Sequence, residues 1–354
     1  MPSQVDVLSH RRQPLKKSVL IAGIAGASLG TELFKSLRQT GRYSIYGADI
    51  SPYAYGLYEQ GFARTYVVDL GNYIASILEV CKRHRIDVIV PGGEGPLYLL
   101  TAHRDLFDRE NIILAMNSTR LVELCTNKAR TFEYLNGRSI PIPETRLIDD
   151  IEELRHIKYP CVLKPSTGSG GSVFVHLAED ANEAIVYASY LKRRGVSLVA
   201  QDYISHDEGE YSVGVLSLPS GEILGSIAMQ KVFSAKLSYV IKYKDRIISS
   251  PYSQGLIDDF KDVRRQAENI ALEIDSRGPL NIQGRLVRGV FYPFEINPRF
   301  SGGTYLRAMA GFNEIDMFLR FVLEGKRVSP KKIKRGYFLR SLKEEYICCR
   351  AIKT

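Results

Sequence analysis

The fold of this chain is decided by the stretch Asn281-Ile-Gln-Gly-Arg-Leu-Val-Arg-Gly-Val-Phe-Tyr-Pro-Phe-Glu-Ile-Asn-Pro-Arg299. Its apolar residues and the pair Arg288-Gly289 predict two strands joined by a turn. Glu295 and Asn297 are two residues apart, so their side chains share one face of a strand. Both offer the hard oxygen ligands that Mg²⁺ takes, and Arg299 is a cation suited to phosphate or an acyl oxyanion. The alternative is a strand that ends in a polar surface turn.

The register of this hairpin decides whether Gln283 joins the same site. A two-residue loop at Arg288-Gly289 would place Gln283 opposite Phe294, on the other side of the sheet from Glu295. A three-residue loop at residues 287–289, or an equivalent bulge, would place Gln283 on the side of Glu295. We predict the longer turn or the bulge if the hairpin supplies a metal site.

The composition is that of a globular protein. The 354 residues are 45% hydrophobic and 25% charged, enough for about two or three domains. No run of about 18 apolar residues predicts a membrane span. The first 17 residues carry several basic residues but are not followed by the apolar h-region of a secretory signal, so we expect a loose leader. The five cysteines lack metal spacing, which favours a cytoplasmic protein with buried thiols.

The net charge of +9 raises the question of a nucleic-acid partner. The basic residues are scattered, apart from clusters at 192–194 and 331–335, and no nucleic-acid motif accompanies them. We therefore expect a solvated basic face, or attraction for anionic nucleotide and substrate, and no nucleic acid or membrane as a partner.

The N-terminal part is predicted to be a small α/β domain. A buried strand at residues 18–24 leads through Gly23, Gly26 and Gly30 into a helix at residues 32–38. The spacing is not the G-x-G-x-x-G of dinucleotide-binding folds. Asp49, at the end of a strand at residues 43–48, resembles a ribose-binding acid, but an ordinary acid at a strand end fits equally well.

The same domain offers one candidate substrate residue. We expect short strands at residues 66–68, 86–90 and 112–115 and a helix at residues 74–85. The strand at 86–90 ends in Pro-Gly-Gly-Glu-Gly, and ligands of open α/β sheets bind at such strand ends. Glu94 is therefore a candidate substrate contact, with an exposed loop acid as the alternative.

A second candidate site follows two predicted helices at residues 118–124 and 127–135. The strand at residues 159–165 ends with Lys164 and is followed by Ser-Thr-Gly-Ser-Gly-Gly-Ser and a strand at 173–176. Such a loop can direct backbone N–H groups at phosphates, and the lysine adds positive charge. A flexible hairpin without a ligand is the alternative.

The remaining elements are predicted from periodicity and turn residues. We expect a short helix at 151–157 and a further helix at 179–194. The later expectations are strands at 198–204, 211–218 and 222–229, helices at 256–274 and 305–325, and a strand pair or extended cover at 336–347. The segment at 231–246 is rich in lysine and tyrosine and is either a loop for an anionic substrate or a solvated β-rich face.

With both candidate sites in place, residues 18–325 resemble the ATP-grasp superfamily, in particular the branch similar to the large subunit of carbamoyl phosphate synthetase. The resemblance implies an α/β pre-grasp (Rossmann-like) domain followed by an α+β ATP-grasp domain of two subdomains. The implied division is a leader at 1–17, the pre-grasp domain at 18–116, the ATP-grasp domain at 117–330 with its lid subdomain at about 143–200, and an extension at 331–354.

The resemblance also implies roles for individual residues. The expected ATP-binding residues are Lys128, Lys164, Ser166, Gly168, Ser169, Gly170 and Gly171 around the phosphates, Gln201, Asp202, Tyr203 and Ile204 as the hinge at the adenine, and Glu210 at the ribose. The expected metal ligands for Mg²⁺ or Mn²⁺ are Gln283, Glu295 and Asn297. Arg299 is the expected catalytic residue, and Glu94, Gly302 and Gly303 are the expected substrate contacts. Asp202 departs from the glutamate that is common in this branch.

The implied activity is an ATP-dependent ligase that joins a small carboxylate to an amine, one of them an amino acid, through an acyl phosphate. The chain lacks the second half and the allosteric domain of the synthetase large subunit, so carbamoyl phosphate synthesis is not expected. A homodimer is a further expectation. The alternatives are a nicotinamide-dependent oxidoreductase that uses Gly23, Gly26, Gly30 and Asp49, and a non-catalytic nucleotide-binding protein.

Overall fold

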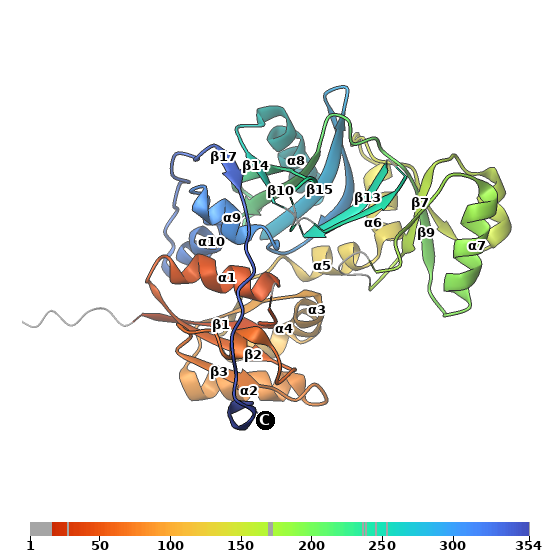
Figure 1. The fold of residues 1–354 in the computed structure, drawn as a ribbon. Helices are drawn as coiled ribbons and strands as arrows, with labels where there is room; N and C mark the ends of the chain where they lie inside the picture. Colours follow the sequence, from red (N-terminus) through yellow and green to blue (C-terminus); the bar gives the residue numbers. More distant parts are fainter. Residues whose placement is uncertain are drawn as a thin grey trace, which may run out of the picture.

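The computed structural model describes residues 16–353, apart from residues 27, 169–172, 236, 238, 245 and 253. They form a parallel five-stranded sheet, an antiparallel four-stranded sheet, an antiparallel six-stranded sheet and a two-stranded hairpin. Figure 1 shows the five-stranded sheet below the six-stranded sheet and the four-stranded sheet at the right. None of the described helices is both long and apolar enough to cross a membrane.

The N-terminal sheet confirms the predicted α/β domain. Its order is β3 (Arg64–Val67), β2 (Tyr43–Asp49), β1 (Lys17–Ala22), β4 (Val88–Pro91) and β5 (Ile113–Leu114). All neighbours pair in parallel. The apolar runs of the central strands are buried on both faces, as parallel strands between helices require.

Alternate residues of β1 belong to two different cores. Val19 and Ile21 pack with α1 (Leu29–Arg38), whereas Leu20 and Ala22 face the helices on the other side of the sheet. The helices of that other side are α2 (Tyr73–His84), α3 (Glu94–Ala102) and α4 (Arg104–Arg109). The core of α1 continues into helices near the C-terminus, and this shared core joins the N-terminal sheet to the rest of the chain.

Two short helices connect the N-terminal sheet to the lid. They are α5 (Thr119–Thr126) and α6 (Lys128–Asn136). The side chain of Asn127 caps α6 by accepting a hydrogen bond from the backbone N–H of Arg130 at 3.1 Å. The helix thus begins at Lys128, one residue after the predicted start at residue 127.

The lid is the four-stranded sheet with one covering helix. Its order is β6 (Thr145–Ile148), β9 (Leu198–Asp202), β7 (Cys161–Pro165) and β8 (His176–Ala178). The helix α7 (Ala181–Lys192) covers one face of it, and the predicted helix at 151–157 is the 3₁₀ helix η2 (Ile151–His156).

The six-stranded sheet has one apolar face, and its other face is polar around Gln283 but apolar at Ile227 and Met229, which pack with the C-terminal helices. Val213 and Ile282 pack against α8 (Lys261–Glu273), whereas Ser212 and Gln283 point to the opposite side. The order of the strands is β16 (Val290–Asn297), β15 (Pro279–Val287), β10 (Glu210–Ser217), β11 (Ile223–Lys231), β14 (Gly255–Ile257) and β17 (Gly336–Phe338). The polar part of the face opposite α8 is the surface on which a ligand site can be built.

Two helix predictions were wrong. The helix expected at 256–274 begins only at Lys261, because Gly255–Ile257 forms β14 and pairs with β11. The helix expected at 305–325 is two helices, α9 (Thr304–Met309) and α10 (Glu314–Glu324), separated by Gly311 with a φ of 104°. That backbone angle is incompatible with a continuous right-handed helix.

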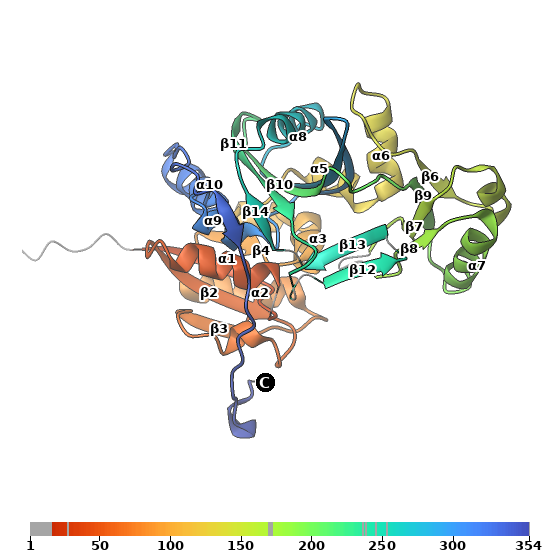
Figure 2. The same cartoon turned by 45° about the horizontal axis from the view of Figure 1, so that its top comes forward.

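One strand prediction also needs correction. The strand expected at 173–176 starts at His176, because Phe174 lies in a turn with a φ of 59°. Of the two readings of residues 231–246, the structure agrees with strands, because β12 (Tyr239–Tyr243) lies there and pairs with β13 (Arg246–Tyr252). Figure 2 shows this hairpin beside the lid, and Arg246 forms an ion pair with Glu179 of the lid at 2.5 Å.

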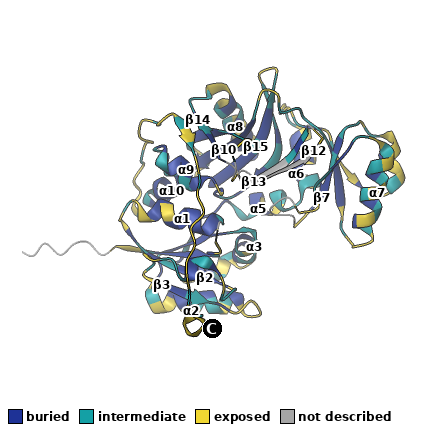
Figure 3. Cartoon of the chain, viewed as in Figure 1, coloured by how far each residue is buried: buried dark blue, intermediate teal, exposed yellow. Residues whose placement is uncertain are grey.

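The C-terminal tail is an extended cover with one short strand, as predicted. After β17 it crosses α1 and ends beside the N-terminal sheet (Figure 1). Arg340 pairs with Glu32 of α1 at 3.1 Å, and Lys343 pairs with Glu59 at 3.0 Å. Figure 3 shows that the tail is largely exposed. Cys348 and Cys349 lie in it and are exposed, contrary to the expectation of buried thiols, whereas Cys81 and Cys161 are buried.

Candidate active site

A β-bulge brings Gln283 to the side of Glu295. Val287 pairs with Val290 across a two-residue turn, so the predicted three-residue loop is wrong. The register shifts after Gln283, Phe294 is the extra residue, and Gln283 pairs with Glu295. The amide Nε2 of Gln283 donates a hydrogen bond to Glu295 Oε2 at 3.0 Å. The alternative prediction, an equivalent bulge, is thereby confirmed.

Glu295 is held between two amides. Asn297 Nδ2 donates to Glu295 Oε1 at 3.0 Å, so each carboxylate oxygen accepts one amide N–H. The oxygen of Gln283 accepts from Lys231 Nζ at 2.7 Å and is thus directed away from Glu295. The orientation of an amide group is an assignment made from such contacts.

These donors fit a divalent cation in part. The two oxygens of Glu295 and the rotatable amide of Asn297 suit Mg²⁺ or Mn²⁺, which share their coordination with phosphates and water. No group of three or more His, Cys, Asp or Glu side chains with metal-binding geometry occurs among the described residues. The place of Gln283 in the metal set stays a prediction, because its oxygen would first have to leave Lys231.

Lys164 contacts the strand that carries Glu295. It is 6% exposed, and its Nζ donates to Gln201 Oε1 at 2.7 Å and to the carbonyl of Phe294 at 3.0 Å. The bulge thus provides an acceptor for this lysine. Burial lowers the pKa of Lys164 to about 7, the ammonium of Lys128 acts in the same direction, and Glu295 opposes them.

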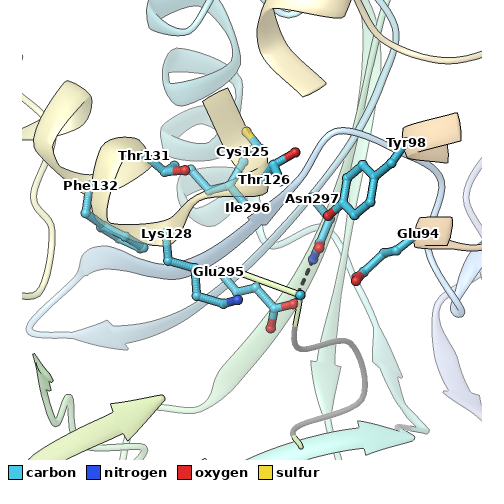
Figure 4. Close-up of a pocket in the computed structure, with 11 residues that line it drawn as sticks. Glu94, Tyr98, Cys125, Thr126, Lys128, Thr131, Phe132, Glu295, Ile296 and Asn297 are labelled. Atoms are coloured by element: carbon cyan, nitrogen blue, oxygen red, sulfur yellow. Dashed lines mark hydrogen bonds between the residues drawn. The ribbon is translucent and has the colours of Figure 1, made fainter. Parts of the chain in front are cut away.

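Lys128 approaches from the other side. It is the first residue of α6, and its backbone N–H donates to the carbonyl of Ser166 at 2.8 Å. Figure 4 shows the side chains of Lys128 and Glu295 pointing toward one another. Ser166 is buried, and Gly168 lines the pocket that is described below. The predicted loop residues Ser169, Gly170 and Gly171 lie outside the described residues.

The predicted hinge is attached to the lid through its backbone. Asp202 N–H donates to the carbonyl of Glu144 at 2.9 Å, and Tyr203 N–H donates to that of Pro160 at 3.2 Å. The carboxylate of Asp202 lies 3.7 Å from the ammonium of Lys158, at the surface of the lid. Main-chain contacts therefore define this segment, and the substitution of a glutamate by Asp202 does not disturb them.

Glu210 is 1% exposed and lies between two cations that the sequence did not point to. Lys231 Nζ donates to its Oε1 at 2.8 Å, and Arg285 Nε donates to its Oε2 at 2.9 Å. Burial alone would raise the pKa of Glu210, but Lys231 and Arg285 outweigh burial and lower it. A role of Glu210 at the ribose stays a prediction. Arg285 could have been noticed because it follows Gln283 by two residues and shares its face.

Arg299 forms an ion pair with Glu94 of the N-terminal domain. Its Nη2 lies 2.9 Å from Glu94 Oε1, and the two side chains are 16% and 25% exposed. Arg299 Nη1 also donates to the carbonyl of Phe300 at 3.0 Å. Glu94 is the first residue of α3 and not part of a loop. A helix of the N-terminal domain and the segment after β16 thus place opposite charges beside one another.

A pocket lies where these groups meet (Figure 4). Its walls come from α3, from α5 and α6, and from β16. The lining residues are Glu94, Tyr98, Cys125, Thr126, Lys128, Thr131, Phe132, Gly168, Glu295, Ile296 and Asn297. Tyr98, Cys125 and Thr126 were not predicted, because helix residues in an apolar pattern give no sign that they face a ligand.

Two predicted substrate residues lie apart from this lining. Gly302 and Gly303 form the turn before α9. Gly303 N–H donates to Ser301 Oγ at 2.8 Å, and the carbonyl of Gly302 accepts a hydrogen bond from Arg340 of the tail. Neither is among the described residues that line the pocket. Their contact with a substrate stays a prediction.

The N-terminal glycine turn has no free acid for a ribose. The carboxylate of Asp49 is 7% exposed and accepts from the N–H groups of Ile24 at 2.7 Å and Ser51 at 3.0 Å. A Cβ on Gly30 would lie 1.8 Å from the carbonyl oxygen of Gly23. Close packing explains this glycine, so the alternative of a nicotinamide site loses its main residues.

Two families match separate parts of the chain. The family described as "PylC-like, N-terminal domain" matches residues 19–115, and the family described as "ATP-grasp in the biosynthetic pathway with Ter operon" matches residues 196–345. The first match covers the N-terminal sheet. The second begins just before the hinge and includes the whole six-stranded sheet.

Curated relatives and solved structures agree with these families. The formate-dependent phosphoribosylglycinamide formyltransferase of Wolinella succinogenes is 24% identical over 77% of this chain and 68% of its own. The carbamoyl phosphate synthase large chain of Clostridium beijerinckii is 22% identical over 71% of this chain, but this chain spans only 23% of its length. An ADP complex of N5-carboxyaminoimidazole ribonucleotide synthetase is 16% identical, with a TM-score of 0.65 over 90% of this chain and 80% of the other.

The sheet order, the polar hairpin and the two family matches lead to the same conclusion. The N-terminal parallel sheet precedes an ATP-grasp fold, and the relatives include synthetases of the carbamoyl phosphate type. Residues 196–345 of this chain therefore match an ATP-grasp family, behind an N-terminal domain that matches the PylC-like family.

Proposed function

We propose that this protein is an ATP-dependent ligase that joins a carboxylate to an amine through an acyl phosphate and releases ADP and phosphate. The observation that carries the proposal is the pocket between the two sheets. Lys128 and Glu295 line this pocket, and Lys164 contacts the same hairpin through the carbonyl of Phe294. Glu94 also lines the pocket and forms an ion pair with Arg299. This set can hold phosphates at one end and a substrate at the other.

The phosphate end is formed by Lys128, Lys164 and the loop from Ser166. Lys164 donates to Gln201 and to the carbonyl of Phe294. A phosphate oxygen is a stronger acceptor than either, so it can replace one of them. Glu295 and Asn297 would hold Mg²⁺ or Mn²⁺, which offsets the charge of the phosphates when bound. The ammonium groups and the loop amides orient the γ-phosphate for transfer.

The substrate end is formed by Arg299 and Glu94. In the first step a carboxylate oxygen attacks the γ-phosphorus of ATP, the bond to the β-phosphate oxygen breaks, and ADP leaves. In the second step the amine attacks the acyl carbon, loses a proton and displaces phosphate. Arg299 stabilises the charge on the acyl phosphate and on the tetrahedral oxyanion. Closure of the lid keeps water from the intermediate.

An amino acid is the proposed substrate at this end. Glu94 lines the pocket, Arg299 is its ion-pair partner at 2.9 Å, and both side chains are partly exposed. An amino acid carries the two complementary charges at a similar separation, so it can replace the internal ion pair without leaving either residue uncompensated. Tyr98, Cys125 and Thr126 would contact its side chain.

The decisive experiment measures ADP formation over pairs of amino acids and small carboxylates in the presence of MgCl₂. A pair that releases ADP and phosphate and yields a new amide supports the proposal. ADP formation with no pair, although the protein binds ATP, would favour the non-catalytic nucleotide-binding alternative. A change in nicotinamide absorbance would favour an oxidoreductase.

Further features of the protein stay proposals. These are the domain boundaries at residues 116/117 and 330/331, the adenine and ribose roles of the hinge and Glu210, and a homodimer. The activities of the large synthetases are not transferred, because this chain spans less than a quarter of their length.

A further inference from the structure

Arg285 on β15 is buried, and its guanidinium donates hydrogen bonds to three other parts of the chain. Its side chain is 4% exposed. Its Nε donates to Glu210 Oε2 at 2.9 Å, Nη1 donates to the carbonyl of Ile204 at 2.6 Å, and Nη2 donates to the carbonyl of Ile247 at 2.7 Å. Three different strands or loops are thus tied to one guanidinium. Its planar fork is suited to such fixed, divergent contacts.

The bond to Ile204 attaches the hinge to the six-stranded sheet. On the lid side the hinge is fixed by the N–H groups of Asp202 and Tyr203. On the other side the carbonyl of Ile204 is fixed by Arg285. The guanidinium also lies over the ring of Tyr203, 5.0 Å from its centroid. The hinge is therefore held from both of the elements that it connects.

Glu210 and Lys231 keep Arg285 in place. Glu210 is buried beside Arg285 on the neighbouring strand, where the register pairs the two residues directly. Lys231 is the second cation beside this carboxylate. Its Nζ also donates a hydrogen bond to Gln283, which in turn donates one to Glu295. A buried charge with full hydrogen bonding has one allowed geometry, so this network resists movement of the guanidinium.

We propose that Arg285 is a positioning residue that holds residues 201–204 in the conformation that receives the base of ATP. The inference rests on the proposed function, in which ATP binds at this hinge. Without Arg285 the hinge must be ordered by ATP itself, which weakens binding of the nucleotide. The phosphates remain held by Lys128 and Lys164, so the rate of phosphoryl transfer from bound ATP changes little. The expected signature is a rise in KM for ATP with kcat nearly unchanged.

The test compares Arg285→Met with Arg285→Lys. We expect Arg285→Met to raise the Kd for ADP, measured by titration calorimetry with MgCl₂, and the KM for ATP by about tenfold. Arg285→Lys retains the charge beside Glu210 and one donor, so its Kd should lie between those of Arg285→Met and the wild type. Arg264→Met is the matched control, because Arg264 is a half-buried arginine that pairs with Asp259 away from the hinge.

A double variant addresses the stability of the fold. Arg285→Met leaves a buried carboxylate short of a partner, and Arg285→Met with Glu210→Gln removes that charge. The double variant should regain thermal stability but not the affinity for ADP. A folded Arg285→Met or double variant with a Kd for ADP within about twofold of wild type would overturn the inference. A wild-type protein that binds no adenine nucleotide would overturn the proposed function as well.

Discussion

The N-terminal glycine turn and the C-terminal hairpin look like two candidate ligand sites, and their polar groups are used differently. At the turn, Asp49 accepts hydrogen bonds from the backbone N–H groups of Ile24 and Ser51. The missing side chain of Gly30 allows its backbone to pack closely against Gly23. In the hairpin, Glu295 and Asn297 line a pocket and contact groups that can rotate or be replaced. The lesson is that a polar residue indicates a site only when its partners can be exchanged for a ligand.

The largest expected difference between the two regions is in activity. Glu295→Gln removes the only carboxylate of the hairpin site and should lower ATP turnover by about 10³-fold, because the charge of the phosphates is then not offset. The matched variant is Asp49→Asn, at the end of β2 beside the glycine turn. Its turnover should stay within about threefold of wild type while it loses roughly 1–2 kcal/mol of stability, because one backbone N–H loses its acceptor. Steady-state ADP release and thermal unfolding measure both effects.

The comparison fails if the two variants exchange their effects. Full turnover of Glu295→Gln would remove this residue from the metal site. Loss of turnover in a folded Asp49→Asn variant would instead return the glycine turn to the list of ligand sites.

The next expected effect is on stability and belongs to the glycine turn. A Cβ on Gly30 would lie 1.8 Å from the backbone oxygen of Gly23, and the position of a Cβ is fixed by its own backbone, so no change of rotamer relieves the contact. Gly30→Ala should therefore lower the free energy of unfolding by about 3 kcal/mol or more. Gly95→Ala is the control, because no atom lies within 4 Å of its added Cβ on helix α3. It should be neutral or stabilising by about 0.5–1 kcal/mol.

Denaturant unfolding followed by circular dichroism measures this difference. Equal stability of the two glycine variants would contradict close packing as the reason for Gly30. A folded fraction of Gly30→Ala that binds ADP as the wild type does would separate the turn from the nucleotide site.

The faces of strands could be predicted from the sequence, but the partners across strands could not. Alternation alone places Glu295 with Asn297 and Gln283 with Arg285. The bulge at Phe294, which brings these pairs to one side, depends on how two strands align. The network of Lys231, Glu210 and Arg285 joins three strands, and Arg285 lies 75 residues from Glu210, so no local sequence pattern predicts it.

Short elements escaped prediction for a different reason. The strand Gly255–Ile257 is only three residues long and precedes a helix, so its apolar residues continue the helical pattern. The break at Gly311 was missed because one glycine inside a periodic pattern is compatible with a helix. The strand is fixed by its pairing with β11, and the helix break is fixed by the positive φ of Gly311. Neither feature follows from local helix preference.

The smallest expected effect concerns pH and tests the hairpin through Lys164. The pKa of this lysine is lowered to about 7 by burial first and by Lys128 second. A bound phosphate favours the ammonium and raises this pKa in the complex. Between the two pKa values the complex binds more protons than the free protein. The affinity for ATP should therefore fall as the pH rises above about 7, by at most about tenfold per pH unit.

Titration calorimetry at about pH 8 in buffers of different ionisation enthalpy measures the accompanying uptake of a proton. At about pH 6 the lysine is charged in both states, so this contribution should vanish. Lys164→Arg keeps its charge throughout, and its affinity, though weaker, should show no such pH dependence. The bond from Lys164 to the carbonyl of Phe294 ties this lysine to the bulge. The absence of proton uptake in the wild type would therefore mean that the phosphates do not reach the hairpin side of the pocket.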